Sequence, residues 1–323
     1  MKKKQLTIGL ILALLIAAIA ISASLVYAKK KDTLSQSQLE ELYISREEIA
    51  VPGLAKEYHL FFMADSHISL CDDRDAEVLE KAQQRQAAFC DENGVASPET
   101  FDKLVKASNT LESDLFIMGG DIIDSAMYAS IDYLKDELGK LKAPYLYSLG
   151  NHDFEYGEEY FSDAAYEDYL PRLDTVRNEG TYQTVEYDDL IIFAANDKNN
   201  QIDKSTVDGL KAALETGKPV VVVLHVPIEP LTGDDSLLQQ SIDVWGPSKK
   251  GRSRVLLGKN SCKPKEDTQE FIDLITAPDS MVQLVLGGHI HFYHKDNLNE
   301  RLAQIVTGAA YEKHALFVTL KPE

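Results

Sequence analysis

Short apolar runs recur along the chain beyond residue 46, with polar or helix-patterned stretches between them. The runs are residues 60–64, 115–118, 145–149, 190–195, 220–224 and 282–286. Several are rich in β-branched or aromatic residues, and Gly, Pro or Asp bounds most of them, as is typical of buried strands. Helical spacing occurs in residues 99–113, 133–141 and 207–219. This alternation predicts one α/β domain with buried sheets and no internal boundary.

The N-terminus is apolar over residues 6–28, which carry no charge and lie between lysines at 2–4 and 29–31. A cleavable signal peptide has an apolar region of about 7–15 residues, whereas about 20 apolar residues suffice to span a bilayer. The length therefore favours a signal anchor in residues 1–31, with a single pass through the cell membrane and an extracytoplasmic domain. Small residues near Ala28 leave secretion after cleavage as the alternative.

Two regions follow the N-terminal segment. Residues 32–46 are polar and charged and predict a stalk. Residues 47–323 then hold all the apolar runs and form the predicted domain. The net charge of −19 and the pI near 4.8 disfavour long nucleic acid as a partner.

Three cysteines are compatible with export. Cys71 and Cys90 could pair across a short loop, and three unpaired thiols are equally compatible with the sequence.

Polar residues follow five of the apolar runs, at the point where each run ends. Five of the eight histidines are among them, and a strand's period of two would place His289 and His291 on one face. In open α/β sheets, ligands bind in the crevice beyond the carboxyl ends of the strands. The residues at these ends are Asp65, His67, Asp121, Asp124, Asn151, His152, Asp153, His225, His289 and His291.

The residue types at these ends suit one kind of site. Asp, His and Asn are ligands for Mn, Fe, Zn or Mg, and the absence of Cys among these residues argues against a structural thiolate zinc site. Two metals close together need a bridging group. Asp121 is the natural bridge, because it follows two glycines that let the backbone approach a metal closely.

The order of these blocks resembles the signature of the calcineurin-like metallophosphoesterases. The blocks are D-x-H at Asp65, G-D-x-x-D at Gly120, G-N-H-D at Gly150, the lone His225 and G-H-x-H at Gly288. Residues 47–67 also resemble the opening strand pair of that family. The resemblance implies a two-sheet sandwich flanked by helices (αββα) and a hydrolase that uses two divalent metal ions.

The resemblance also implies a role for each matching position. One metal would be held by Asp65, His67, Asp121 and His291, and the other by Asp121, Asn151, His225 and His289. His152 would protonate the leaving oxygen, a contribution of about 10²–10⁴ in rate. Asp124 would orient the His152 ring and keep it protonated beside two cations.

The implied substrate is a small phosphate mono- or diester. The protein-phosphatase branch is disfavoured, because Ser125 and Leu149 stand where that branch carries arginines. An alternative function is a membrane-anchored binding module whose metals only stabilise loops. That reading would be marked by loss of His152 or Asp124, and both are present.

Two further stretches bear on the substrate. Residues 153–173 interleave aromatics and acids, which predicts an amphipathic cap helix with Tyr160, Phe161 and Tyr169 packed inward, or else an aromatic wall of the pocket. Residues 245–265 bring Lys and Arg into an acidic protein, as a solvated loop or as a holder of a phosphate or lipid head group.

Four other residues are not predicted to be ligands. Asp153 is assigned a capping or supporting role. His59, His294 and His314 match no motif, although His294 is near enough to the predicted rim to be a minor candidate.

Overall fold

The computed structural model describes residues 32–323 except 155–162, 178–179, 198–199, 248–255 and 259–261. The predicted anchor in residues 1–31, the aromatic residues Tyr160 and Phe161 and most of the basic stretch lie outside the described residues. Among the helices that are described, none combines the length and the apolar character needed to cross a membrane.

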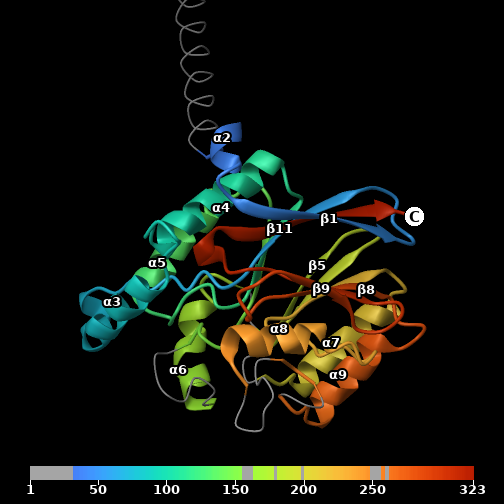
Figure 1. Cartoon of the computed structure of the whole chain (residues 1–323). Helices are drawn as coiled ribbons and strands as arrows, with labels where there is room; N and C mark the ends of the chain where they lie inside the picture. The colour runs from blue at the N-terminus through green and yellow to red at the C-terminus, as the bar shows by residue number, and fades with distance from the viewer. Residues whose placement is uncertain (1–31, 155–162, 178–179, 198–199, 248–255, 259–261) are drawn as a thin grey trace, which may run out of the picture.

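Two sheets form the centre of the domain (Figure 1). The first has the strand order β1-β11-β2-β3-β4, and the second has the order β5-β6-β7-β8-β10-β9. The strands of the first sheet are β1 (Tyr43–Val51), β11 (His314–Pro322), β2 (Tyr58–Met63), β3 (Leu115–Gly119) and β4 (Tyr145–Ser148). Those of the second are β5 (Tyr182–Glu186), β6 (Ile191–Ala195), β7 (Val220–Val223), β8 (Val282–Gly287), β10 (Ala303–Val306) and β9 (His294–Asn297).

The six apolar runs of the sequence form β2, β3, β4, β6, β7 and β8, so the strand predictions and the two-sheet α/β sandwich are confirmed. These strands are buried on both faces, which is why they read as continuous apolar runs. In β2, Leu60 and Phe62 pack into the core between the sheets. Phe61 and Met63 face the opposite side, against the helices that cover the first sheet.

Helices cover the outer faces of both sheets (Figure 1). Three pack on the core of the first sheet, namely α4 (Ser97–Leu111), α5 (Tyr128–Leu138) and α6 (Asp163–Leu173). Two pack on that of the second, namely α7 (Lys204–Glu215) and α9 (Glu266–Thr276). The predicted helices correspond to α4, α5 and α7. Tyr169 of α6 is partly buried against the first core, as expected for a cap helix.

The remaining helices are short or lie in connections. They are α2 (Gln36–Leu39), η1 (Asp73–Val78), α3 (Leu79–Ala88), α8 (Ser236–Trp245) and η2 (Ala310–Glu312). The stretch that the sequence suggested as a stalk, residues 32–46, holds α2 and the first residues of β1. Helix α3 belongs to a long excursion between β2 and α4, and it projects at one side of the domain (Figure 1).

The last strand enters the first sheet between its two earliest strands. β11 pairs in parallel with β1 and antiparallel with β2, so β1 and β2 are not neighbours.

Cys71 and Cys90 are both thiols, and no disulfide joins them.

The parallel pairing of the central strands directs their carboxyl ends to one edge of each sheet. β2, β3 and β4 run in parallel in the first sheet, and β6, β7 and β8 do so in the second. The loops that follow these strands carry the residues singled out by the sequence.

Candidate metal centre

The first group of candidate ligands comes from the loops after β2 and β8. The Nε2 atoms of His67 and His291 lie 3.3 Å apart. His291 Nε2 is 3.4 Å from Asp65 Oδ1, and His67 Nε2 is 4.0 Å from the same oxygen. Three ligand atoms this close can surround one ion that is about 2.0–2.2 Å from each of them.

The second group comes from the loops after β3, β7 and β8. His225 Nε2 lies 3.1 Å from Asp121 Oδ2 and 3.2 Å from His289 Nδ1. His225 is held in place by its other ring nitrogen, which lies 2.9 Å from the carbonyl oxygen of Gly119. That hydrogen bond fixes the ring so that Nε2 faces the other two ligand atoms.

Asp121 stands between the two groups. Its Oδ2 atom, which contacts His225, is also 3.9 Å from His67 Nε2 in the first group. Its other oxygen accepts the backbone N–H of His152 at 2.7 Å. One carboxylate facing both groups is the arrangement that a bridge between two metal ions requires.

The residues present fit two cations. Asp65 Oδ1 and Asn151 Oδ1 are buried and have no hydrogen-bond partner within the described part of the chain. Buried acceptors are rarely left unpaired, because each costs its full desolvation. Both oxygens belong to predicted ligands. Asp65 Oδ1 lies in the first group, where a cation would supply the missing partner. The set of imidazole, carboxylate and amide oxygen is one that suits Mn, Fe, Zn or Mg.

The electrostatics of the second group favour a cation. Burial lowers the pKa of His289 to about 3, so that its ring is neutral and able to bind a metal. Burial also opposes a charge on His225, but the adjacent Asp121 carboxylate raises the pKa of His225 well above its usual value. The pKa of Asp121 is in turn held well below its usual value by His225 and His152, against its burial. The Asp121 carboxylate therefore favours a positive charge at this position.

Five of the predicted ligands adopt left-handed backbone conformations, with φ between 48° and 72°. They are Asp65, His67, Asp121, His289 and His291. Residues other than Gly rarely adopt this conformation, and such outliers concentrate at functional sites.

One expectation from the sequence is corrected. β8 ends at Gly287, so His289 and His291 lie beyond the strand and its period of two does not place them on one face. They lie in different ligand groups, as the family resemblance implies.

Asp124 and His152 lie beside the first group. Asp124 Oδ1 is 3.0 Å from His152 Nδ1 and also 3.0 Å from His67 Nδ1. Burial opposes protonation of His152, but Asp121 and Asp124 raise its pKa. His152 therefore has the acidic partner that the sequence predicted for it, and the same carboxylate also orients the candidate ligand His67.

Arg85 is a site residue for which the sequence gave no signal. Its Nη2 atom lies 2.8 Å from Asp124 Oδ1, and its Nε atom donates to Asp124 Oδ2. Nη2 is also 3.3 Å from His152 Nδ1. Although His67, Asp124 and His152 are close enough to hold an ion, the guanidinium makes this position unfavourable for a further cation. We therefore interpret the three as a hydrogen-bonded unit.

Asp153 ties the loops of the site together. Its two oxygens accept the backbone N–H groups of Asp121, Ile122, Ile123 and Gly150, and the hydroxyl of Tyr147. With both oxygens engaged by donors, Asp153 has a supporting role.

The other histidines lie outside the two groups. His59 is near Asp114, His294 contacts Gln240, and His314 stacks on Tyr43.

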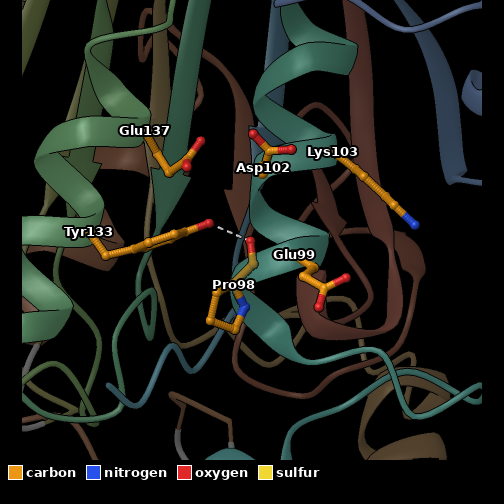
Figure 2. Close-up of a pocket in the computed structure, with 6 residues that line it drawn as sticks. All are labelled: Pro98, Glu99, Asp102, Lys103, Tyr133 and Glu137. Atoms are coloured by element: carbon orange, nitrogen blue, oxygen red, sulfur yellow. Dashed lines mark hydrogen bonds between the residues drawn. The ribbon is translucent and has the colours of Figure 1, made fainter. Parts of the chain in front are cut away.

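A separate hollow lies between α4 and α5 (Figure 2). It is lined by Pro98, Glu99, Asp102, Lys103, Tyr133 and Glu137. Asp102 is already paired with Lys106 and Lys140. None of the predicted ligands lines this hollow, so it has no part in the metal centre.

Comparisons with known proteins bear on the family and the fold. The sequence model described as calcineurin-like phosphoesterase matches residues 58–293, a span that includes every predicted ligand. No curated protein matches the chain.

Solved structures of similar fold include a dimetal phosphatase from Danio rerio, with a TM-score of 0.50 and 12% identity over 82% of this chain and 92% of that one. A purple acid phosphatase from yellow lupin (Lupinus luteus) seeds has a TM-score of 0.46 and 12% identity over 83% of this chain and 46% of that one.

Proposed function

The chain belongs to the calcineurin-like phosphoesterase family and is a hydrolase of phosphoric esters, and we propose that it cleaves small phosphate mono- or diesters at a dinuclear metal centre. The observation that carries the proposal is the position of Asp121 Oδ2 between the two ligand groups. The proposed ligands are Asp65, His67, Asp121 and His291 for one ion, and Asp121, Asn151, His225 and His289 for the other.

Two divalent cations held by these residues would polarise the phosphoryl oxygens and would lower the pKa of a water from 15.7 to about 7. The chain's own residues supply the remaining steps. A water oxygen forms a new bond to phosphorus as the phosphorus–oxygen bond to the leaving group breaks. The electron pair of the broken bond moves onto the leaving oxygen, and His152 donates a proton there. Asp124, 3.0 Å from His152 Nδ1, keeps the ring oriented and charged before the transfer.

Turnover is favoured over metal-stabilised binding by the pair formed by His152 and Asp124. A site whose metals only stabilise loops has no need for a partly exposed imidazole that is hydrogen-bonded to a buried acid. The acidic charge of the chain favours small substrates over long polyanions.

The purified full-length protein, stripped of metal and reloaded with Mn²⁺, should hydrolyse a nitrophenyl phosphate monoester or the bis-nitrophenyl diester. Asp121→Asn is the matched blank, because it keeps the size of the side chain and removes the bridging charge. The ratio of diester to monoester turnover chooses the substrate class. Protein that binds two ions and turns over neither ester would favour the binding module.

We also propose that residues 1–31 anchor the protein in the cell membrane with the domain outside the cytoplasm, on the basis of the uncharged stretch between two lysine clusters. The test is fractionation after an alkaline wash, together with the N-terminal sequence of the mature protein. Retention in the membrane with an intact N-terminus supports the anchor. A soluble chain that begins just after Ala28 supports secretion instead.

A further inference from the structure

The buried carboxylate of Asp124 serves two imidazoles with a single oxygen. Oδ1 lies 3.0 Å from both His67 Nδ1 and His152 Nδ1. One of these rings is a proposed metal ligand and the other is the proposed acid. A rotation of this one carboxylate would therefore misdirect both rings, so its orientation matters for the metal and for the proton.

Arg85 supplies the contact that prevents such a rotation. It binds both oxygens of Asp124, through Nε to Oδ2 and through Nη2 to Oδ1. A guanidinium that spans a carboxylate in this way fixes the plane of the carboxylate as well as its charge. The two imidazoles approach Asp124 at Oδ1.

Arg85 is itself held against the site by an aromatic stack. Its guanidinium lies over the ring of Phe89, 4.7 Å from the ring centroid. Phe89 in turn stacks on His67, with centroids 4.0 Å apart and an angle of 8° between the planes. The contacts form a closed circuit that runs from Arg85 through Phe89, His67 and Asp124 back to Arg85.

The excursion between β2 and α4 supplies two residues of this circuit. Arg85 lies in α3, and Phe89 lies directly after it. We propose that Arg85 is a positioning residue, which holds Asp124 and thereby directs the His152 proton toward the leaving oxygen and His67 toward the first metal group. The expected effect on reaction rates rests on the proposed phosphoester hydrolysis, whereas the expected effect on the positions of the His67 and His152 rings does not.

The kinetic consequence depends on the leaving group. A nitrophenolate departs without needing a proton, whereas an alkoxide must receive one as the phosphorus–oxygen bond breaks. Loss of Arg85 should therefore lower kcat by about 10–100-fold for an alkyl phosphate ester, which is part of the roughly 10²–10⁴-fold that a general acid contributes, because His152 remains present but is less well positioned. For the nitrophenyl ester the loss should stay within about threefold, and KM should change little for either substrate.

Two variants of Arg85 and one control separate the possible roles. Arg85→Gln removes the charge, and Arg85→Lys keeps the charge but loses the two-point contact. Arg74→Gln is the matched control, because Arg74 belongs to the same excursion, is half exposed and pairs with Asp72 and Asp132. Both Arg85 variants should show the leaving-group dependence, and the control should behave as the wild type does. Equal losses on both esters, a rise in KM alone, or full rescue by Lys would overturn the positioning role.

A second readout does not depend on turnover. In the zinc-loaded protein, the Nδ1–H protons of His67 and His152 should give downfield NMR resonances because both are bonded to Asp124. Arg85→Gln should broaden or shift these resonances, and Arg74→Gln should leave them in place. Unchanged resonances in Arg85→Gln would overturn the inference even if the wild type hydrolyses esters. Altered resonances would support it even if the proposed substrates are wrong.

Discussion

Gly120 offers a direct test of how tightly the second ligand group is packed. Its φ is +91°, and a Cβ added there would lie 2.5 Å from His225 Nδ1 and 2.8 Å from the backbone nitrogen of Gly150. Ordinary contacts between carbon atoms are about 3.5–4.0 Å, so the neighbours must shift by about 1 Å. The His225 ring is fully buried and bonded to the Gly119 carbonyl, so it has no room in which to move.

The expected cost of Gly120→Ala has two parts. The left-handed backbone costs about 1–2 kcal/mol for a residue with a Cβ. Forcing a methyl group into packed surroundings costs about 1–3 kcal/mol more. The free energy of unfolding should therefore fall by about 2–5 kcal/mol. Because the shift falls on His225, affinity for one of the two metals should fall by about 10–100-fold, as it does when a group that orients a ligand is lost.

Gly94→Ala is the control for the backbone term. Gly94 has a φ of +77°, and a Cβ there would meet no atom within 4 Å. Gly94→Ala should lower the free energy of unfolding by about 1–2 kcal/mol and should not change the affinity for either metal ion. Urea unfolding of the metal-free proteins and titration with Mn²⁺ would measure both effects. Equal destabilisation by the two substitutions, or unchanged binding of both ions by Gly120→Ala, would refute the reasoning.

Three other predictions concern the metals and the pH dependence of stability. His291→Ala should lower the affinity for one ion and leave the affinity for the other within about threefold of the wild type, because His291 contacts only the first group. Calorimetric titration with Mn²⁺ would measure both affinities, and two equally weakened sites would contradict this prediction. Trp245, the single tryptophan of the chain, has its ring 5.2 Å from that of His291, so paramagnetic Mn²⁺ should quench its fluorescence; a signal that is unchanged on loading contradicts the site. Burial raises the pKa of Asp296 from 3.8 to about 6, although a hydrogen bond from Gln304 opposes the shift. The protonated side chain therefore stabilises the fold below about pH 4, and this stability is lost as the pH rises through 6. Asp296→Asn should remove this loss. Between pH 4 and 7.5 its stability should rise by about 2–3 kcal/mol relative to the wild type, and parallel pH profiles of the two proteins in urea unfolding would argue against this prediction.

The strands and the rim of the site could be predicted from the sequence, because buried parallel strands leave a strong signal. Runs such as residues 220–224 are apolar throughout, and the fold requires their carboxyl ends to meet. The chemistry of the residues that follow these strands then indicates a metal site.

The partners of these residues could not be predicted in the same way. Arg85 lies in a helix of ordinary composition, and only the folding of the excursion brings it to Asp124. The insertion of β11 between β1 and β2 joins segments more than 250 residues apart, which local patterns do not encode. The left-handed conformations of His289 and His291 were also unforeseen, because propensity alone argues against them.

The central claim is that two ions held by these groups are needed for hydrolysis. The most direct test is to titrate the metal-free, full-length protein with Mn²⁺ while measuring bound metal and ester hydrolysis in the same samples. We predict that two ions bind per chain, that turnover appears as the second site fills, and that Asp121→Asn abolishes it. Full turnover with one ion or none, or in Asp121→Asn, would contradict the account.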